Sequence, residues 1–480
     1  MSEQVQEPVV ADRSPAALPD EEPVQSSRTG SRWWTDLRPL FLRLHFYVGI
    51  FVGPFILVAA VTGLLYTITP QLDQIVYRDA LHVPVGTNRL DLSDQVTAAT
   101  AAVPNGTITQ IRPPIAADAT TRVTFSAPGV EEGYGRTAFV DPYTGEVRAV
   151  LDTFGEWLPA RAWIDTLHRT LHLGEFGRLY SELAASWLWV LALSGIAVWV
   201  VRRRRTARIR RTLLPEPSAR GRARLRSWHG AVGLWISIGM LVLSVTGLTW
   251  SSFAGANVSE LRADLNWTTP SVSTELPTGS SAAAPTDPGE VGGTADRVLA
   301  AAHEAGMTDP VAITPAAEDG QAWLVAQVKR SWPLRQDVMA VDPTSGEVLD
   351  TVRYTDWPLM AQAASVGISL HMGILFGIGN QLLLVAIAVG IICIVLWGYR
   401  MWWLRRPTRA GATTPSGTQR PSALSIGVIG AVAIALGIFF PVLGVSLLAF
   451  LALDAAWHQL RARRTPPVAT PVDVPERDPV

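Results

Sequence analysis

The chain has 480 residues, of which 48% are hydrophobic and 17% are charged, and its formal net charge is −1. Ordinary soluble domains carry about 25% charged residues, so this composition excludes a wholly soluble enzyme and indicates a membrane protein. The near-neutral charge gives no sign of a nucleic-acid-binding protein. The lone Cys393 excludes an intramolecular disulfide, a cysteine-ligated iron–sulfur cluster and a CxxCH haem attachment site.

The chain begins with a polar, acidic segment rich in Pro and Ser, which predicts a disordered tail and not a signal peptide. Crossing a hydrocarbon core of about 30 Å takes about 20 helical residues. Four apolar runs reach this length, near 45–68, 183–201, 229–250 and 379–402. A fifth apolar region, broken at Pro441 and Gly444, is about twice as long and predicts a pair of short spans.

Arginines cluster before the first span, between the second and third, after the fourth and after the last. Because cytoplasmic loops of membrane proteins hold the positive charge, all four clusters are predicted to lie in the cytoplasm. The amino terminus is then cytoplasmic, and the two large soluble regions, roughly 69–180 and 251–370, face the outside.

An internal repeat relates the two halves of the chain. Each half consists of a predicted span, a soluble module and a second predicted span. In each module the sequence predicts a helix (about 92–103 and 295–306), β-rich runs (Thr121–Ser126 and Trp323–Val328) and a hairpin at D-P-x-x-G-E-V. The matching motifs are HFYVG at 45–49 with HGAVG at 229–233, TGL at 62–64 with 246–248, DPYTGEV at 141–147 with DPTSGEV at 342–348, and HLG at 172–174 with HMG at 371–373.

The predicted fold is a membrane α-helical bundle of four core spans with a C-terminal pair, carrying two extracytoplasmic α+β modules in a tandem repeat. The predicted segments are a cytoplasmic tail (1–31), the first span (32–68), the first module (69–180), the second span (181–202), an arginine-rich cytoplasmic loop (203–227), the third span (228–251), the second module (252–374) with a flexible insertion (266–294), the fourth span (375–403), a cytoplasmic linker (404–422), the C-terminal pair (423–460) and a cytoplasmic tail (461–480).

Histidines recur at the predicted span ends, where an ionisable residue is costly and usually marks a proton path, a metal or a cofactor. The repeat pairs His45 with His229 at the inner ends and His172 with His371 at the outer ends. A haem iron held by two neutral imidazoles needs ligands from facing helices at one level, so two pairs predict two haems of type b, one in each leaflet. His168 replaces His172 as the outer ligand or acts beside it.

Arg43 and Arg226 each stand close to an inner histidine and are candidates to pair with haem propionates. The competing interpretation of each histidine taken alone is an interfacial residue or a helix cap. His82, His303 and His458 have no repeat partner, and we interpret them as structural.

The same motifs, together with LHRTLHLGEFGR at 167–178, LHMGILFG at 370–377 and GYRMWWLRRP at 398–407, make the chain resemble the PepSY-associated transmembrane (PepSY-TM) family over about 40–406. The resemblance implies a bacterial cytoplasmic (inner) membrane protein with two extracytoplasmic PepSY modules. Some members are di-haem reductases of ferric siderophores, and the family's histidine positions fall on His45, His168, His172, His229 and His371.

The resulting hypothesis is a haem-containing electron-transfer protein in the lipid bilayer that reduces an external ferric siderophore or other ferric chelate. Its electron donor is a quinol or a cytoplasmic reductase. Two alternatives remain open: a regulatory or binding protein without a cofactor, since PepSY modules elsewhere resemble inhibitory propeptide domains, and a transporter for iron or a siderophore whose histidines bind metal directly.

Overall fold

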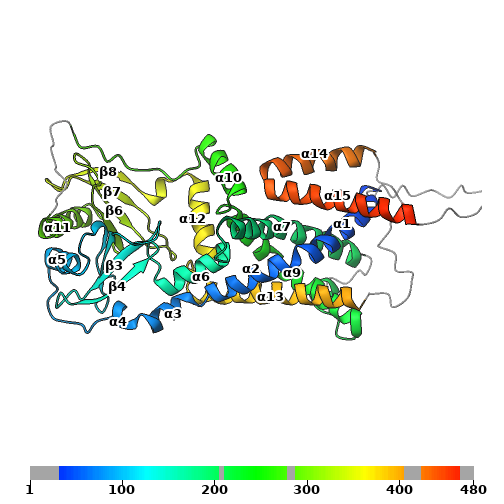
Figure 1. Cartoon of the computed structure of the whole chain (residues 1–480), viewed down its shortest axis with the longest axis horizontal. Helices are drawn as coiled ribbons and strands as arrows, with labels where there is room; N and C mark the ends of the chain where they lie inside the picture. Colours follow the sequence, from blue (N-terminus) through cyan, green and yellow to red (C-terminus); the bar gives the residue numbers. More distant parts are fainter. Residues whose placement is uncertain (1–31, 205–209, 278–286, 405–422, 465–480) are drawn as a thin grey trace, which may run out of the picture.

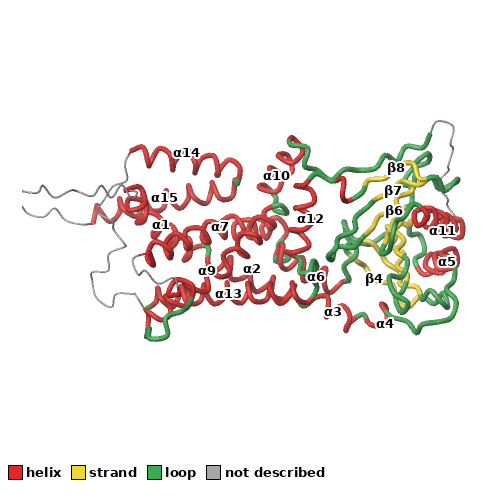
Figure 2. Tube along the Cα trace, turned by 180° about the vertical axis from the view of Figure 1, so that it is seen from behind, coloured by secondary structure: helices red, strands yellow, loops and turns green. Residues whose placement is uncertain are grey.

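The computed structural model describes residues 32–204, 210–277, 287–404 and 423–464. The molecule is elongated, with a β-sheet at one end and a helical bundle at the other (Figures 1 and 2). We call the end of the bundle beside the sheet proximal and the opposite end distal. The predicted tail at 1–31 and most of the predicted linker at 404–422 and tail at 461–480 lie outside the described residues.

Three described helices are long and apolar enough to cross a membrane, and a bent pair forms a fourth candidate span. The pair, α1 and α2, is bent by 59°. The bend falls immediately before Pro54, which stands in the first turn of α2, where a missing backbone N–H is tolerated. Helices of sufficient length and apolarity to cross a membrane therefore occupy all four predicted spans, and the first of them is broken. Their bounds are α1 (Arg32–Phe51), α2 (Gly53–Tyr66), α7 (Gly174–Arg204), α9 (Gly221–Leu248) and α13 (Ile378–Trp403).

The C-terminal apolar region forms a helical hairpin, α14 (Ala423–Phe439) and α15 (Pro441–Arg464), beside the bundle in Figure 1. Its apolar parts are shorter than the spans. The two helices approach closely at Gly437 and Gly444, where an added Cβ would meet backbone atoms. Trp187 Nε1 on α7 donates a hydrogen bond to Ser446 Oγ at 2.9 Å, which joins α15 to the bundle.

The two soluble modules share one eight-stranded sheet of order β4-β3-β2-β1-β5-β6-β7-β8. The central strands β1 and β5 pair antiparallel, with Ile111 opposite Ile313. Antiparallel pairing of equivalent strands is what a local two-fold axis produces, so the repeat seen in the sequence is also a repeat in space. The strands are β1 (Thr107–Arg112), β2 (Thr121–Ser126), β3 (Gly135–Val140), β4 (Val147–Thr153), β5 (Val311–Thr314), β6 (Trp323–Gln327), β7 (Val338–Val341) and β8 (Val348–Val352).

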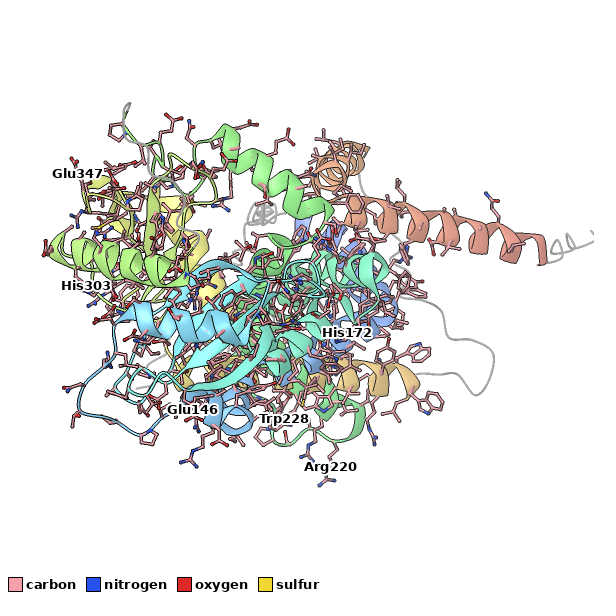
Figure 3. The ribbon with its side chains drawn as sticks, turned by 60° about the vertical axis from the view of Figure 1, so that its left-hand side comes forward. Glu146, His172, Arg220, Trp228, His303 and Glu347 are labelled. Atoms are coloured by element: carbon pink, nitrogen blue, oxygen red, sulfur yellow. The ribbon has the colours of Figure 1, made fainter. Side chains whose placement is uncertain are left out.

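The predicted strand at Thr121–Ser126 is confirmed as β2, and both D-P-x-x-G-E-V stretches turn between paired strands as predicted. In each turn an aspartate, Asp141 or Asp342, accepts backbone N–H bonds from the two turn residues that follow its proline. Glu146 and Glu347, labelled in Figure 3, end these turns. The two hairpins are therefore built by the same side-chain contacts.

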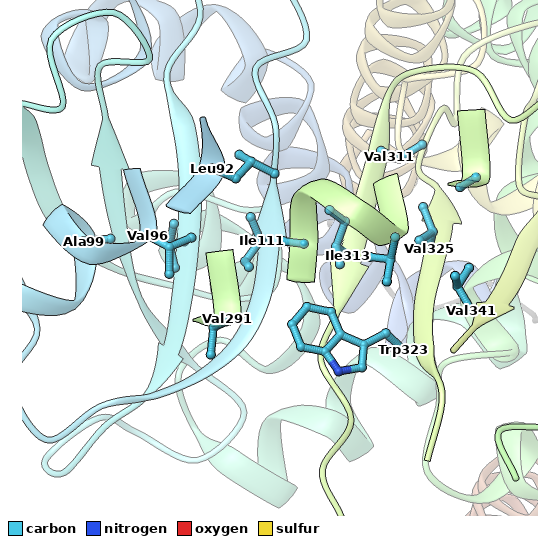
Figure 4. Packing of buried hydrophobic residues seen from close by; sticks show 14 of the residues in the cluster. Leu92, Val96, Ala99, Ile111, Val291, Val311, Ile313, Trp323, Val325 and Val341 are labelled. Carbon is cyan, nitrogen blue, oxygen red and sulfur yellow. The ribbon is translucent and has the colours of Figure 1, made fainter. Parts of the chain in front are cut away.

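Helices α5 (Leu92–Ala102) and α11 (Pro288–Glu304) pack side by side on the sheet, and their apolar faces join both halves in one hydrophobic core (Figure 4). Helix α11 begins inside the range predicted as a flexible insertion, because Asp287 caps it by accepting from the N–H groups of Gly289 and Glu290. Gly292 permits the close approach, since a Cβ there would lie 2.3 Å from the Cα of Ser93.

We therefore expect Gly292→Ala to destabilise the sheet domain by about 1–3 kcal/mol, because overpacking would push α5 and α11 apart. Gly293→Ala is the matched control, since nothing lies within 4 Å of a Cβ at that neighbouring position. Removing a mid-helix glycine there should stabilise the protein by up to about 1 kcal/mol. Thermal unfolding of the two purified variants measures the difference, and shifts of the same sign would contradict the prediction.

The remaining elements connect the sheet to the bundle. Glu182, a fully buried carboxylate on α7, accepts hydrogen bonds from the backbone N–H groups of Phe253 and Ala254 and so holds the start of α10. The connecting elements are α3 (Thr69–Val76), α4 (Arg78–Leu81), α6 (Pro159–Thr170), α10 (Phe253–Asp264), the 3-10 turn Tyr354–Asp356 and α12 (Leu359–His371). The short helix α8 (Arg210–Leu213) lies instead in the connection between α7 and α9.

Candidate functional site

Two histidine pairs lie at different levels of the helical bundle. His168 on α6 and His371 on α12 face each other with ring centroids 6.5 Å apart, and we call them the proximal pair. His45 on α1 and His229 on α9 have centroids 6.1 Å apart and form the distal pair. Each pair takes one residue from each half of the repeat.

Hydrogen bonds orient the proximal imidazoles through their Nδ1 atoms. Nδ1 of His168 lies 2.9 Å from Thr62 Oγ1, and Nδ1 of His371 lies 2.6 Å from Thr246 Oγ1. Each threonine already donates its hydroxyl proton to a backbone carbonyl one turn earlier. With that single hydroxyl proton on the carbonyl, each threonine accepts from the imidazole, an arrangement that puts the ring proton on Nδ1 and leaves the lone pair on Nε2.

The distal imidazoles also make hydrogen bonds through their Nδ1 atoms. His229 Nδ1 lies 2.8 Å from the carbonyl oxygen of Ile394, which can only accept. His45 Nδ1 lies 3.1 Å from Ser194 Oγ, whose own proton goes to the carbonyl oxygen of Leu191. Within the described part of the chain all four rings therefore use Nδ1 as the donor, the arrangement in which a second partner fixes a metal-ligating Nε2.

Each of the four rings also lies against a glycine. An added Cβ would stand 3.1 Å from His168 Cε1 at Gly63 and 3.0 Å from His45 Cε1 at Gly195. The repeat-related glycines, Gly247 and Gly398, lie 3.8 Å by the same measure from Cε1 of His371 and His229 respectively. These glycines keep the space around the imidazoles open.

The ring separations fit one metal ion between each pair of imidazoles. A metal–imidazole bond is about 2.0–2.1 Å and the ligating nitrogen lies about 1.1 Å from the ring centre, so centroids on opposite sides of a metal lie about 6.3 Å apart. The observed values are 6.5 and 6.1 Å. Neutral imidazoles are common haem ligands, so the donor atoms of each pair are compatible with an iron ion held between two histidines.

A cavity of about 730 Å³ contains the proximal pair. Apolar residues such as Ile56 and Ile391 line it inside the bundle, whereas Trp157, Trp357 and Arg330 line it towards the sheet. Ligand pockets of about 300–1,000 Å³ hold drug-sized and cofactor-sized molecules. The cavity therefore has the size and the mixed lining that a bound cofactor requires.

His172, predicted as an outer ligand, lies away from this cavity. Helix α6 ends at Thr170, and Leu171 and His172 both have positive φ, so His172 does not continue the helical face of His168. Its ring packs on Trp163, and its Nε2 lies 3.1 Å from the carbonyl oxygen of Trp163. The side chain is exposed, at the turn labelled in Figure 3. The structure thus brings His168, and not His172, to His371.

The other predicted residues have the following positions. Arg43 is exposed on α1, and Arg226 is half-buried on α9. Each takes part in an interaction within the protein. His82 and His303 lie beside carboxylates, Asp118 at 2.9 Å and Asp309 at 3.4 Å. The side chain of His458 lies outside the described residues.

Sequence reasoning assigned no role to Thr62, Thr246, Ser194, Gly195 or Gly398. Two of them belong to the repeated Thr-Gly-Leu motif, so the repeat contained a signal for them. Gly195 and Gly398 are separated by the same number of residues as His168 and His371. Extending the repeat along α7 and α13 at that spacing would have identified them.

A second cavity, of about 340 Å³, lies beside α3 and is lined by Asp73, Arg122 and Glu156. Asp73 is 8% exposed, and its Oδ1 has no hydrogen-bond partner among the described residues. Burial raises the pKa of Asp73 to about 6, although Arg161 and Arg122 oppose the shift. This carboxyl group therefore stays protonated up to a higher pH than an ordinary aspartate does.

Because the native pKa of Asp73 is above its ordinary 3.8, the folded state binds more protons than the unfolded state between about pH 4 and pH 6. This contribution to stability is present below pH 4 and is lost as the pH rises to 6, by at most about 3 kcal/mol. We expect Asp73→Asn to unfold at a higher temperature than the parent at pH 7.5 and at a similar temperature at pH 4. Asp79→Asn, at an exposed position, is the control; equal effects of both variants would refute the assignment.

Comparison with known proteins gives one family. Residues 42–405 match the family model described as the PepSY-associated TM region. The match begins within α1, covers the rest of the four candidate membrane spans, the whole sheet and both histidine pairs, and leaves α14 and α15 outside. A search of curated proteins finds no match.

Proposed function

The chain belongs to the family of PepSY-associated TM regions, and from this premise we propose that it is a haem-containing electron-transfer protein that reduces a ferric siderophore or another ferric chelate. The family and the spans make it a membrane protein. The haems, the direction of electron flow and the acceptor belong to the proposal.

One observation carries the proposal. Four histidines form two facing pairs, related by the internal repeat, with Nδ1 of every ring hydrogen-bonded to an acceptor in the protein. Histidines that only cap helices or anchor at an interface do not need matching partners, matching glycines and matching separations. Two sites that each hold one metal ion between two imidazoles would account for them.

The arrangement supports transfer across the bilayer because the pairs lie at two depths. On α7, Gly195 lies beside His45 of the distal pair. Ala185, also on α7, lies beside Gly247, which is itself close to His371 of the proximal pair. Ten residues separate Ala185 from Gly195, which is about 15 Å of helix. In our proposal the arginine-rich segments at the distal end lie in the cytoplasm. Electrons then enter from a quinol or a cytoplasmic reductase near the distal pair and leave near the proximal pair, beside the sheet.

Haem, when bound, supplies reversible one-electron chemistry at its iron. The chain supplies the rest. Thr62 and Thr246 hold the proximal imidazoles in one tautomer, and Ile394 and Ser194 do the same for the distal ones. The apolar helices exclude water around the rings, and the sheet end presents the surface on which an external acceptor docks.

The absorption spectrum of the detergent-purified protein, air-oxidised and then reduced with dithionite, tests the proposal. We expect the bands of low-spin b-type haem, and pyridine haemochromogen quantitation should give two haems per chain. Replacement of His82 or His303, which lie beside carboxylates outside the bundle, should leave the spectrum unchanged. A colourless protein from cells supplied with haem precursors would refute the proposal and favour a regulatory or binding role.

A further inference from the structure

Arginines line the sheet-side mouth of the proximal cavity. Among the described residues, Arg169, Arg178, Arg262 and Arg330 line this cavity together with two carboxylates, Asp165 and Glu182. Asp165 is paired with Arg169 at 3.0 Å, and Glu182 is bonded to the start of α10. Arg178 Nη1 lies 3.9 Å from Glu175 Oε1, so Arg169 and Arg178 each have an acidic neighbour. Arg262 and Arg330 are the remaining arginines of this lining.

Arg330 stands at the boundary between this cavity and solvent. It comes from the connection between β6 and β7, and its Nη1 lies 3.7 Å from Glu156 Oε1, across the two halves of the repeat. Arg112 Nη1 already donates to the other oxygen of Glu156 at 3.2 Å. Two guanidinium groups thus share one carboxylate, whose pKa they hold below its ordinary value against the opposing effect of burial. The Arg330 side chain is 44% exposed and accessible to a ligand.

Arg262 adds a second donor at the same cavity. Its Nη2 donates to the carbonyl oxygen of Trp267 at 3.3 Å. Its Nε is buried and has no acceptor within the described residues. A buried donor without an acceptor is costly unless a ligand or a small movement provides one.

We infer that the mouth of the proximal cavity binds carboxylate groups, with Arg330 as the principal ligand-binding residue and Arg262 beside it. The planar guanidinium fork matches a carboxylate in two-point geometry. The carboxylates come from one of two sources, the propionates of a haem on the proximal pair or an incoming ferric hydroxycarboxylate. The inference rests on the proposed function and adds to it the class of ligand, a carboxylate, that the mouth of the cavity binds.

The test compares Arg330→Gln with Arg335→Gln in the full-length protein. Arg335 belongs to the same connection but donates to Thr308 Oγ1 and does not line the cavity. Gallium(III) citrate, which the protein cannot reduce, is titrated calorimetrically into each variant, and the midpoint potentials of the haems are measured by spectroelectrochemistry. Arg330→Lys, which keeps the charge but loses the fork, guards against a folding defect in the glutamine variant.

If the ligand is the chelate, Arg330→Gln should weaken gallium citrate binding at least about tenfold, as expected for a lost charged hydrogen bond, and leave both potentials unchanged. If the ligand is haem propionate, the potential of one haem should fall, because a positive charge beside it is lost, while gallium citrate binding stays the same. Unchanged binding and potentials, or equal changes in Arg335→Gln, would overturn the inference. Colourless parent protein would instead refute the proposed function, and gallium citrate binding would still test the arginine site.

Discussion

Replacing His168 with alanine is expected to remove one of two haems from the purified protein, whereas replacing His172 with alanine is expected to remove none. His168 faces His371 with its Nδ1 bonded to Thr62, so in the proposed function its Nε2 is the atom that would bind iron. His172 is exposed and directs Nε2 to the carbonyl oxygen of Trp163. The two residues are four apart in sequence, which makes them a matched pair for the experiment.

Haem content per chain by pyridine haemochromogen measures the outcome, with His371→Ala as the positive control. Both proximal variants should keep the remaining haem, because the distal pair is held by α1, α9, α7 and α13 independently of α6. Loss of haem in His172→Ala with retention in His168→Ala would show that the outer ligand is the residue beyond the helix end. The ligand assignment made from the structure would then be wrong.

The choice between these two histidines shows where sequence reasoning stopped. The motif H-x-G followed by Phe-Gly aligned His172 with His371, because glycine and phenylalanine in the loop before each span are conspicuous. The structure equates His168 with His371 through their threonine partners, which are repeat-related. The helix ends directly after His371, but two residues after His168, so the loop similarity was shifted relative to the helices.

The other features of the fold also differ in whether they depend on local sequence or on contacts between distant parts of the chain. Spans, β2 and the D-P-x-x-G-E-V turns follow from apolar length, alternation and turn residues, all of which are local, and the sequence predicts them. The fusion of two modules into one sheet depends on pairing β1 with β5, which are some 200 residues apart in the chain. The buried Glu182 likewise finds its partners on α10, so neither contact has a local signal.

The second large effect is expected at the threonines whose hydroxyl groups are hydrogen-bonded to the proximal imidazoles. We expect Thr246→Val to lower the affinity of the proximal site for haem about 10- to 100-fold, the usual cost of removing the hydrogen bond that orients a ligating imidazole. Valine keeps the shape of threonine, so packing against α12 is retained. Without the Oγ1 acceptor, however, Nδ1–H of His371 is buried without a partner and the ring can rotate or change tautomer.

Thr246→Ser is the matched control, because serine keeps the hydroxyl that accepts from His371 and can donate to the carbonyl oxygen of Val242. Its haem affinity should stay within a few-fold of the parent. The rate of haem transfer to an excess of apomyoglobin measures the difference, and Thr62→Val should reproduce the effect through His168 if the repeat is functional. Equal haem retention in Thr246→Val and Thr246→Ser would mean that packing alone orients the ring, and the hydroxyl-fixed tautomer would lose its role in the proposed mechanism.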